Sequence, residues 1–510
     1  MRRDRPLSLV GEENIVWGNK ESDGVNLLFI IADQWRADSL GCAGHLVVQT
    51  PNLDRLAKAG VRFEDCYVQT APCGPSRMCI YTGRYLCSHR AIHNKTPLMD
   101  AEDNLGSWLR DAGYDPHLLG YNDYAIDPRT LPDDDPRAQE LNYDNVLPGF
   151  ETLVYHEYDS QEYFEYLREK GYPEWLLTHK TVHQPNVPDE GPGEHLSLRY
   201  PAHYKAEDCE ARFITNKAIE HVTANKASGW VLNVNYIKPH PPRICSAPFN
   251  DMYDPADMPA AIRDPEELSA DHPYQKLIHA NPQLESDRDL RETQANYFGM
   301  ITEVDTSLGL LFDALEETGQ WEDTVIVFSS DHGEYLGDHY LTGKGQVYDA
   351  GIHVPLIIRD PSWTADPTRG KTLDGFTESV DITPTILDLM GITIPDRVQG
   401  VSLADRISGS VAEGKVDIHF EKDFRHVPGV DPDDSLIWVV RDRDYKYVQF
   451  ASSEIPPMLF DLNADPGEST NLAQSTAHAA TMLEYAQRLL RWRMRHEDQR
   501  MERWASQFKS

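Results

Sequence analysis

Apolar runs of strand length alternate with helix-like segments along much of this chain, and that alternation limits the folds open to it. The run from Val25 to Ala32 is apolar at every position but one and ends in Asp33, as in a strand buried on both faces of a parallel sheet. Further strands are expected at 61–67, 116–119, 230–236 and 324–330, and helices at 51–59, 104–111, 207–225 and 293–317. The pattern predicts an α/β sheet with helices on both faces.

Length and texture predict two domains. The 510 residues exceed the ~250–300 at which one hydrophobic core usually stops growing. We expect a catalytic domain over 1–413 and a C-terminal subdomain over 414–510, with two antiparallel strands and a terminal helix at about 477–504. Two irregular stretches, 123–206 and 241–282, are expected to be long surface excursions, which are often functional.

The charge balance excludes whole classes of partner. The chain has 83 acidic and 48 basic residues, a net charge of −35, which repels nucleic acid and anionic membranes. Seven cysteines without paired metal-type spacing fit a reducing compartment better than a disulfide framework. No apolar stretch approaches the ~18 residues of a membrane span, and residues 1–20 lack the apolar run of a signal peptide. We expect a soluble, cytoplasmic protein that binds neither nucleic acid nor membrane.

Two carboxylates directly follow predicted strands, where ligands bind at the carboxyl edge of an open α/β sheet. The first strand ends in Asp33 and Gln34, and the strand that begins at Thr324 ends in Asp331 and His332. A single aspartate at a strand end is more often a helix cap, but two such sites on buried strands favour one cation site. The imidazole shifts the expected ion from Ca²⁺, which prefers oxygen ligands, towards Mn²⁺.

Cys73 is the second candidate for chemistry. Pro75 suits the first turn of a helix, which would place Cys73 at a helix N-terminus, where the dipole favours anions. A cysteine with a lowered pKa at such a position is a nucleophile, although a lone cysteine is more often a buried structural residue. No Cys–His pair is evident in the sequence, so the residues alone leave both interpretations open.

The motif Cys73-x-Pro75-Ser76-Arg77, followed by Thr82-Gly83-Arg84, resembles the signature of the sulfatase family. The resemblance extends over most of the chain, through Asp33-Gln34-Trp35-Arg36, Lys238-Pro-His-Pro-Pro242, Ser330-Asp-His-Gly-Glu334 and Gly343-Lys344. The Asp-Gln-Trp-Arg opening, the segment 89–94 and Asp423-Phe-Arg425 look closest to the bacterial phosphonate monoester hydrolase and arylsulfatase branch. The resemblance implies an alkaline phosphatase-like fold: a large mixed, mostly parallel sheet flanked by helices, with a smaller C-terminal α+β subdomain.

The resemblance also implies roles for individual residues. In that family the cysteine is oxidised to formylglycine, whose hydrated aldehyde is the nucleophile. The implied ligands of one divalent metal ion are Asp33, Gln34, residue 73, Asp331 and His332. Arg77, His240 and Lys344 are the implied catalytic residues, and Asn94 and Tyr121 the implied substrate contacts. A formylglycine-generating enzyme and a homo-oligomer, a dimer or tetramer, are the implied partnerships.

Two positions depart from the phosphonate hydrolase branch. Ser76 stands where those enzymes generally have alanine, and Asp123 where they tend to have a small hydroxyl residue. If Asp123 contacts substrate, its carboxylate would repel a diester-like anion or favour a substrate with a cationic group. Both departures favour hydrolysis of a small anionic sulfate ester, with phosphonate monoesters or phosphodiesters as the alternative.

Two other classes of function remain open from the sequence. One is a metal-binding pseudoenzyme with unmodified Cys73, which the complete set of candidate ligands disfavours. The other is a metallophosphatase, which would need ligands for a second ion that the sequence does not reveal.

Overall fold

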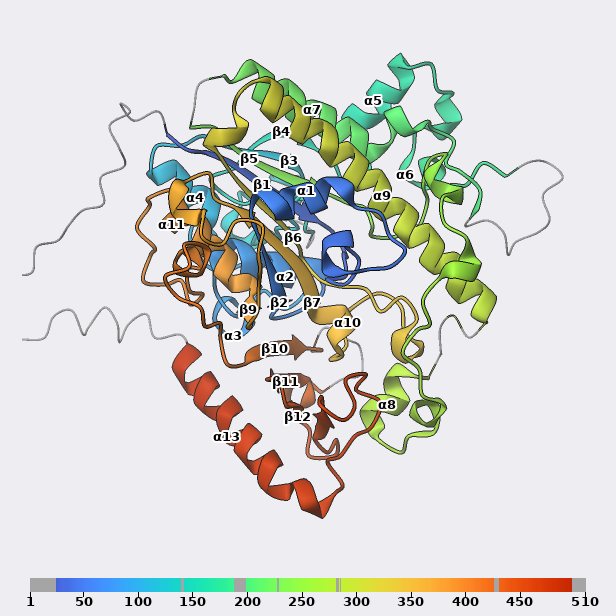
Figure 1. Ribbon diagram of the computed structural model, residues 1–510, viewed down its shortest axis with the longest axis vertical. Helices are drawn as coiled ribbons and strands as arrows, with labels where there is room; N and C mark the ends of the chain where they lie inside the picture. The colour runs from blue at the N-terminus through green and yellow to red at the C-terminus, as the bar shows by residue number, and fades with distance from the viewer. Residues whose placement is uncertain are drawn as a thin grey trace, which may run out of the picture.

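A large mixed sheet forms the centre of the computed structural model, and a small antiparallel sheet lies below it in Figure 1. The structure describes residues 24–138, 142–187, 199–226, 229–280, 284, 286–425 and 431–497. In this part of the chain the large sheet has nine strands, in the order β4–β3–β5–β1–β6–β7–β2–β8, with β9 also paired to β2. Their bounds are β1 Asn26–Ala32, β2 Val61–Tyr67, β3 Pro116–Gly120, β4 Glu151–Tyr155, β5 Val231–Tyr236, β6 Thr324–Ser330, β7 His353–Arg359, β8 Thr372–Leu373 and β9 Thr377–Glu378.

Five neighbouring strands run parallel and end at one edge of the sheet. Strand β1 pairs in parallel with β5 and β6, and β3 pairs in parallel with β5 and β4. Only β7 runs against its neighbours β6 and β2 within this described sheet. The predicted mixed, mostly parallel sheet is therefore confirmed, and the carboxyl ends of β4, β3, β5, β1 and β6 follow one another along a single edge.

The two faces of the large sheet carry separate hydrophobic cores. Alternate residues of β1 point to opposite faces, so Leu28 and Ile30 pack with the helices α1, α7 and α9, whereas Leu27 and Phe29 pack with α2, α4 and α11. The longer described helices are α1 Pro51–Ala59, α2 Cys73–Thr82, α4 Leu105–Asp111, α5 Gln161–Glu169, α7 Glu210–Ala224, α9 Asp287–Glu317, α11 Ile382–Leu389 and α13 Ala479–His496. The shorter ones are α3 Leu86–His89, α6 His179–Val182, α8 Pro273–Ile278, α10 Asp349–Ile352 and α12 Ala404–Ile407.

The small sheet is packed against the large one. Its antiparallel strands are β10 Ile418–Asp423, β11 Leu436–Arg441, β12 Tyr445–Phe450 and β13 Met458–Asp461. Phe420 of β10 and Val439 of β11 belong to the same buried core as Phe63 of β2. The terminal helix α13 covers the small sheet, where Trp492 stacks on His419 with ring centroids 4.4 Å apart. The predicted end of this helix near Trp504 lies outside the described residues.

The stretch 123–206 is more ordered than the sequence suggests. It contributes β4 to the edge of the large sheet and also holds α5 and the short α6. The first three residues of β4 are exposed, so the strand carries no buried apolar run by which it could be recognised. The stretch 241–282 consists largely of short 3-10 turns and α8.

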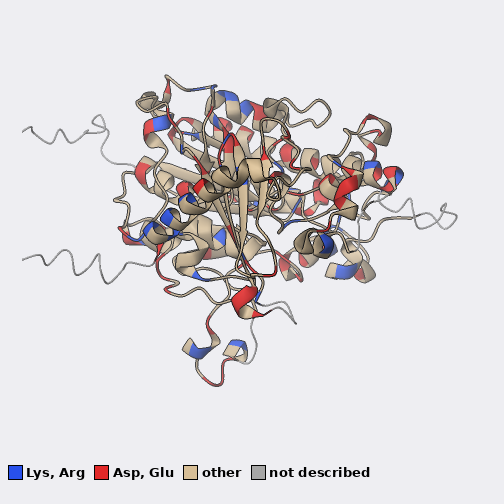
Figure 2. Ribbon diagram, turned by 90° about the horizontal axis from the view of Figure 1, so that it is seen from below, with Lys and Arg blue, Asp and Glu red and all other residues tan. Residues whose placement is uncertain are grey.

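Charged residues lie mainly outside the central strands. Figure 2 shows acidic and basic residues spread over many helices and loops, while the strands at the centre are largely uncharged. None of the described helices is long and apolar enough to span a lipid bilayer.

A buried ion pair joins the segment after β5 to α9. Lys238 donates to Glu303, and both side chains are buried. Glu303 also accepts a hydrogen bond of 3.0 Å from the backbone N–H of Ser246. Glu303 thus fixes two points of the segment that carries His240.

Replacing Lys238 with methionine should destabilise the protein by about 3–5 kcal/mol, because the carboxylate of Glu303 would stay buried without its cation. A urea unfolding series followed by circular dichroism would measure this loss. The matched control is Lys276→Met at the exposed pair with Asp271, where the expected change is at most about 1 kcal/mol. Equal effects at the two positions would contradict the importance of burial.

Candidate active site

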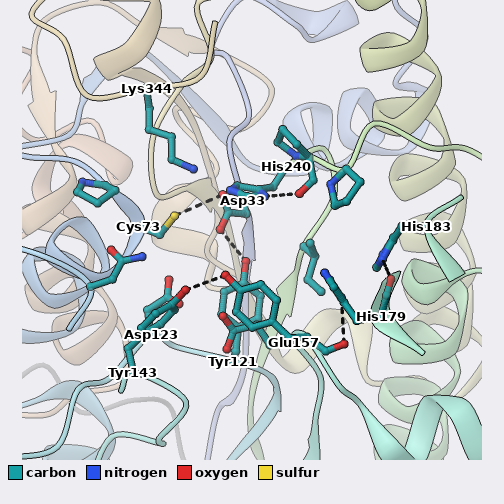
Figure 3. Close-up of a pocket in the computed structure, with 16 residues that line it drawn as sticks. Asp33, Cys73, Tyr121, Asp123, Tyr143, Glu157, His179, His183, His240 and Lys344 are labelled. Atoms are coloured by element: carbon teal, nitrogen blue, oxygen red, sulfur yellow. Dashed lines mark hydrogen bonds between the residues drawn. The ribbon is translucent and has the colours of Figure 1, made fainter. Parts of the chain in front are cut away.

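The cavity at the carboxyl edge of the large sheet is built by the residues that follow the five parallel strands. Asp33 follows β1, Asp331 follows β6, His240 comes from the segment after β5, Asp123 follows β3 and Glu157 follows β4. Side chains from distant parts of the sequence therefore meet (Figure 3). The residues lining the cavity are Asp33, Pro72, Cys73, Asn94, Tyr121, Asp123, Tyr143, Glu157, Tyr158, His179, His183, Ile237, His240, Pro241, Pro242 and Lys344.

Four buried side chains form a group suited to a metal ion. One ligand atom from each of Asp33, Cys73, Asp331 and His332 lies within 4.8 Å of all the others. His332 Nε2 is 3.2 Å from Cys73 Sγ, 3.5 Å from Asp33 Oδ1 and 3.7 Å from Asp331 Oδ1. Two buried carboxylates at such separations repel each other unless a cation lies between them, so this donor set fits a divalent ion.

The outer oxygens of the two carboxylates are already bonded to the protein. Arg77 is fully buried and donates to Asp331 Oδ2 at 2.9 Å and to Asp33 Oδ2 at 3.2 Å. The hydroxyl of Tyr121 donates to the same Asp33 oxygen at 2.6 Å. The two Oδ1 atoms therefore face the metal group, and the position of Arg77 explains their orientation. Direct contact of Arg77 with the nucleophile stays a prediction.

Gln34 lies beside this group. Its side-chain oxygen accepts a hydrogen bond of 2.9 Å from Lys344 Nζ, its side-chain nitrogen donates to Glu334, and its backbone N–H donates to Asp331 Oδ1 at 3.1 Å. The backbone of Gln34 has a φ of 69°, which is uncommon outside glycine. The role of Gln34 as a metal ligand stays a prediction.

Cys73 is the first residue of α2, as its position before Pro75 predicts. The structure also gives it a histidine neighbour that the sequence did not reveal, since His332 is far away in the chain. Burial and the carboxylate of Asp33 raise the pKa of the Cys73 thiol well above its usual value. Burial lowers the pKa of His332 to about 4. The pair therefore lacks the thiolate–imidazolium character of a thiol nucleophile.

Lys344 and His240 line the cavity around Asp33 (Figure 3). Burial alone would lower the pKa of Lys344, but the carboxylates of Asp33 and Asp331 help to raise it overall, so the ammonium stays charged. Burial lowers the pKa of His240. Its Nδ1 lies 2.6 Å from the carbonyl oxygen of Pro241, which can only accept, so the neutral ring carries its proton on Nδ1 and can accept one at Nε2.

Five cavity residues form a feature that we call the tyrosine–carboxylate wall: Tyr121, Asp123, Tyr143, Glu157 and Tyr158. Asp123 Oδ2 lies 3.1 Å from Arg77 Nε. Burial raises the pKa of Asp123 to about 7, against the opposing effect of Arg77. Burial and the nearby Asp123 raise the pKa of Glu157 to about 9. The wall therefore brings two carboxyl groups into an enclosed space.

The structure brings together every site residue predicted from the sequence and adds others. Asn94 lines the cavity and accepts a hydrogen bond of 3.1 Å from the N–H of Gly74. Asp123 lines the cavity, where its carboxylate could contact a substrate. The residues that sequence reasoning missed are Tyr143, Glu157, Tyr158, His179 and His183. All five belong to the stretch 123–206, where β4 was not recognised, and recognition of that strand would have pointed to Glu157.

Family models match nearly the whole described chain. The model of the family named Sulfatase matches residues 25–392. A second model, described as the C-terminal region of N-sulphoglucosamine sulphohydrolase, matches residues 337–495.

Individual relatives agree with these models. The chain is 36% identical to the multifunctional alkaline phosphatase superfamily protein PehA of Trinickia caryophylli, over 94% of this chain and 97% of PehA. It is 28% identical to an arylsulfatase of Clostridium perfringens, over 91% and 93% of the two chains. The crystal structure of a phosphonate monoester hydrolase of Agrobacterium radiobacter superposes with a TM-score of 0.87 at 36% identity, covering 93% of this chain and 96% of that one.

Proposed function

The chain belongs to the sulfatase family, and from this premise we propose that it hydrolyses sulfate esters as its main reaction. It is a hydrolase of sulfate or phosphonate esters, and phosphonate monoesters or phosphodiesters are the alternative substrates of the same site. The observation that carries the choice of sulfate is the carboxylate of Asp123 in the cavity. It adds bulk to the cavity, and a phosphonate monoester or phosphodiester has to accommodate a second organic substituent that a sulfate ester lacks. Charge does not separate the three esters, since each is a monoanion.

Members of this family generally use a metal ion and a formylglycine, and the buried donor group fits both. We propose that Asp33, Gln34, Asp331, His332 and residue 73 hold one Mn²⁺, with Ca²⁺ as the alternative. The imidazole of His332 favours Mn²⁺, because Ca²⁺ prefers an all-oxygen shell. When present, the ion would polarise the ester oxygens and the formylglycine diol would supply the attacking hydroxyl.

The remaining residues position the ester and move protons. Lys344 stabilises negative charge on the ester oxygens, since its ammonium stays charged in the cavity. His240 acts as the acid–base residue through Nε2. The side-chain oxygen of Asn94 is taken by Gly74, which leaves its NH₂ group to donate to the substrate. Arg77 and Tyr121 hold Asp33 in position.

The 36% identical relatives favour the alternative substrate. The solved structures from Agrobacterium radiobacter and Silicibacter pomeroyi are both described as phosphonate monoester hydrolases. Their similarity extends over the whole fold, whereas the argument for sulfate depends on Asp123 and Ser76. The two substrates therefore have to be compared directly.

The deciding experiment measures kcat/KM for an aryl sulfate, an aryl phosphonate monoester and an aryl phosphodiester with the same leaving group. Intact mass should first establish the state of residue 73. A larger value for the sulfate supports our proposal, and a preference for phosphorus esters replaces it with the alternative. A metal analysis on the same sample separates other classes: one ion per chain fits this site, whereas two would indicate a phosphatase.

Asp123→Thr should raise kcat/KM for the phosphodiester relative to the sulfate by about 10-fold, equivalent to ~1.4 kcal/mol. The substitution makes room in the cavity beside Arg77 for the second substituent of the diester. The same kinetic comparison measures the shift, with the exposed Asp159→Asn as a control. An unchanged ratio would show that Asp123 does not discriminate between the two esters.

We also propose a cytoplasmic homo-oligomer, a dimer or tetramer, that a formylglycine-generating enzyme matures and that binds neither nucleic acid nor membrane. Support for a reducing compartment is that none of the seven cysteines, all of them among the described residues, is paired in a disulfide. Support for self-association is the exposure of Leu483 and Leu490 on α13. Light scattering of the purified protein would test the oligomer.

A further inference from the structure

Apart from Tyr121, which holds Asp33 in position, the tyrosine–carboxylate wall has no part in the chemistry assigned to the metal group. Both of its carboxyl side chains are more than nine-tenths buried, with exposed fractions of 3% for Asp123 and 7% for Glu157. Both line the cavity, on the side away from Lys344 (Figure 3). Burial raises the pKa of both carboxyl groups, so they are fully ionised near neutral pH only when a neighbouring cation compensates their charge. The wall therefore needs an explanation in terms of what the cavity binds.

Positive charge from the protein is in short supply at the wall. Arg77 lies within 3.2 Å of three carboxylates, those of Asp33, Asp123 and Asp331. Glu157 forms no ion pair with a lysine or arginine of the described chain, and its one hydrogen bond there comes from the hydroxyl of Tyr155 at 2.5 Å. Asp123 Oδ2 accepts no hydrogen bond from the described residues.

Besides His240, the cavity is lined by His179 and His183, and these two histidines do not supply the missing charge. His183 is 3.1 Å from the buried carboxylate of Glu210, so a proton on His183 is balanced there. Burial and the neighbouring His183 lower the pKa of His179, which keeps that ring neutral. Neither ring offers a free positive charge to Glu157.

The rest of the wall is aromatic. Tyr121, Tyr143 and Tyr158 line the same cavity, and the hydroxyls of Tyr143 and Tyr158 lie 2.7 Å apart. The rings of these last two stand at 81° to each other, with centroids 6.4 Å apart. Aromatic faces combined with carboxylates are the surroundings that proteins use to bind quaternary ammonium groups.

We propose that the tyrosine–carboxylate wall binds an ammonium group carried by the alcohol part of the ester, so that the preferred substrate is a zwitterion. This inference rests on the proposed function, because it assigns the other end of the same substrate. Asp123 Oδ2 and Asp331 Oδ2 lie 3.1 Å and 2.9 Å from the same atom, Arg77 Nε, so the wall begins beside the metal group. It extends from there to Glu157, which follows β4, three strands from β1. An alcohol that carries its ammonium group a few bonds from the ester oxygen can therefore reach the wall.

The test uses two aryl sulfates of the same shape, 4-(trimethylammoniomethyl)phenyl sulfate and its neutral carbon analogue 4-(2,2-dimethylpropyl)phenyl sulfate. The measured quantity is the ratio of their kcat/KM values in the wild type, Asp123→Asn and Glu157→Gln. Comparing this ratio between proteins cancels the difference in intrinsic reactivity between the esters. We expect each substitution to lower the ratio by about 5–30-fold, the equivalent of ~1–2 kcal/mol for a desolvated cation.

Asp159→Asn is the matched control. It makes the same acid-to-amide change two residues from Glu157, but Asp159 is exposed and does not line the cavity. The ratio should stay at the wild-type value in this variant. Equal ratios in all four proteins would overturn the inference, and so would equal losses in Asp159→Asn and Glu157→Gln, which would reflect only the general field of the protein.

A binding measurement separates failure of this inference from failure of the proposed function. Calorimetric titration of Cys73→Ala with benzyltrimethylammonium requires no turnover. Binding that weakens in Cys73→Ala/Glu157→Gln supports the ammonium site even if sulfates are not hydrolysed. Sulfate hydrolysis without such binding overturns the ammonium site and leaves the function standing. Metal analysis gives a further test. Two metal ions per chain in the wild type and one in Glu157→Gln would overturn the ammonium site, because the wall would then be a second metal site.

Discussion

Cys73→Ala should lower kcat/KM by about 10⁴–10⁶-fold for every ester that the wild type hydrolyses, the usual range for loss of a nucleophile. The side chain lies at the start of α2, in contact with His332 and near Asp33, and no other cysteine lines the cavity formed by the described residues. Alanine removes only the reacting group and suits a helix. Circular dichroism and thermal unfolding should therefore stay close to wild type.

Cys79→Ala is the control for this experiment. Cys79 lies on the same helix and is fully buried, but it contacts His89 rather than the cavity. The two variants thus make the same chemical change in the same element, and only Cys73→Ala should lose activity. If Cys73→Ala kept a tenth of the wild-type rate, the nucleophile would have to be another group. Intact mass of the wild type would then show whether residue 73 had been modified at all.

Asp331→Asn should remove most of the bound metal and lower kcat/KM by about 10³-fold or more, since metal coordination contributes several kcal/mol to transition-state stabilisation. Asp331 supplies one oxygen to the metal group and accepts from Arg77 with the other. The variant loses a negative ligand and leaves the buried guanidinium with one fewer carboxylate. Metal per chain, measured by elemental analysis, is the direct readout.

Two further measurements make this prediction specific. Asp305→Asn changes a buried aspartate of α9 that accepts from the backbone N–H of Leu53 at 2.8 Å, and it should keep its metal. A chelator should inactivate the wild type, and Mn²⁺ should restore it. Full activity in chelator, or a normal metal content in Asp331→Asn, would show that the reaction does not depend on this group.

The central part of the fold and the metal group follow from the sequence for the same physical reason. A strand buried on both faces is largely apolar, so β1 and β6 are visible through the runs Leu27–Ala32 and Val325–Phe328. Asp33 and Asp331 directly follow the two strands, and parallel pairing of β1 with β6 brings them together at one edge. The meeting of the two carboxylates could therefore be predicted without coordinates.

The tyrosine–carboxylate wall could not be predicted in this way. Strand β4 has exposed residues and lies at the end of the sheet, so its sequence carries little burial signal. The contact of Cys73 with His332 depends on how α2 packs against the end of β6, and no spacing in the chain encodes such a contact. Helix α9 begins at Asp287, six residues before the start expected from the sequence at 293. The first turn is polar, so it carries no apolar pattern by which the start could be recognised.

The order of the strands along the sheet edge has a consequence for how such an enzyme can diversify. Residues of the metal group follow β1 and β6 at the middle of the sheet, whereas Asp123 and Glu157 follow β3 and β4 at its margin. Tyr121 and Asp123 after β3 still contact Asp33 and Arg77, so mutations after β4 are the ones that can change the cavity with least effect on the groups that break the ester bond. In evolution, or in directed evolution in the laboratory, selectivity for new leaving groups should arise first in the loop after β4.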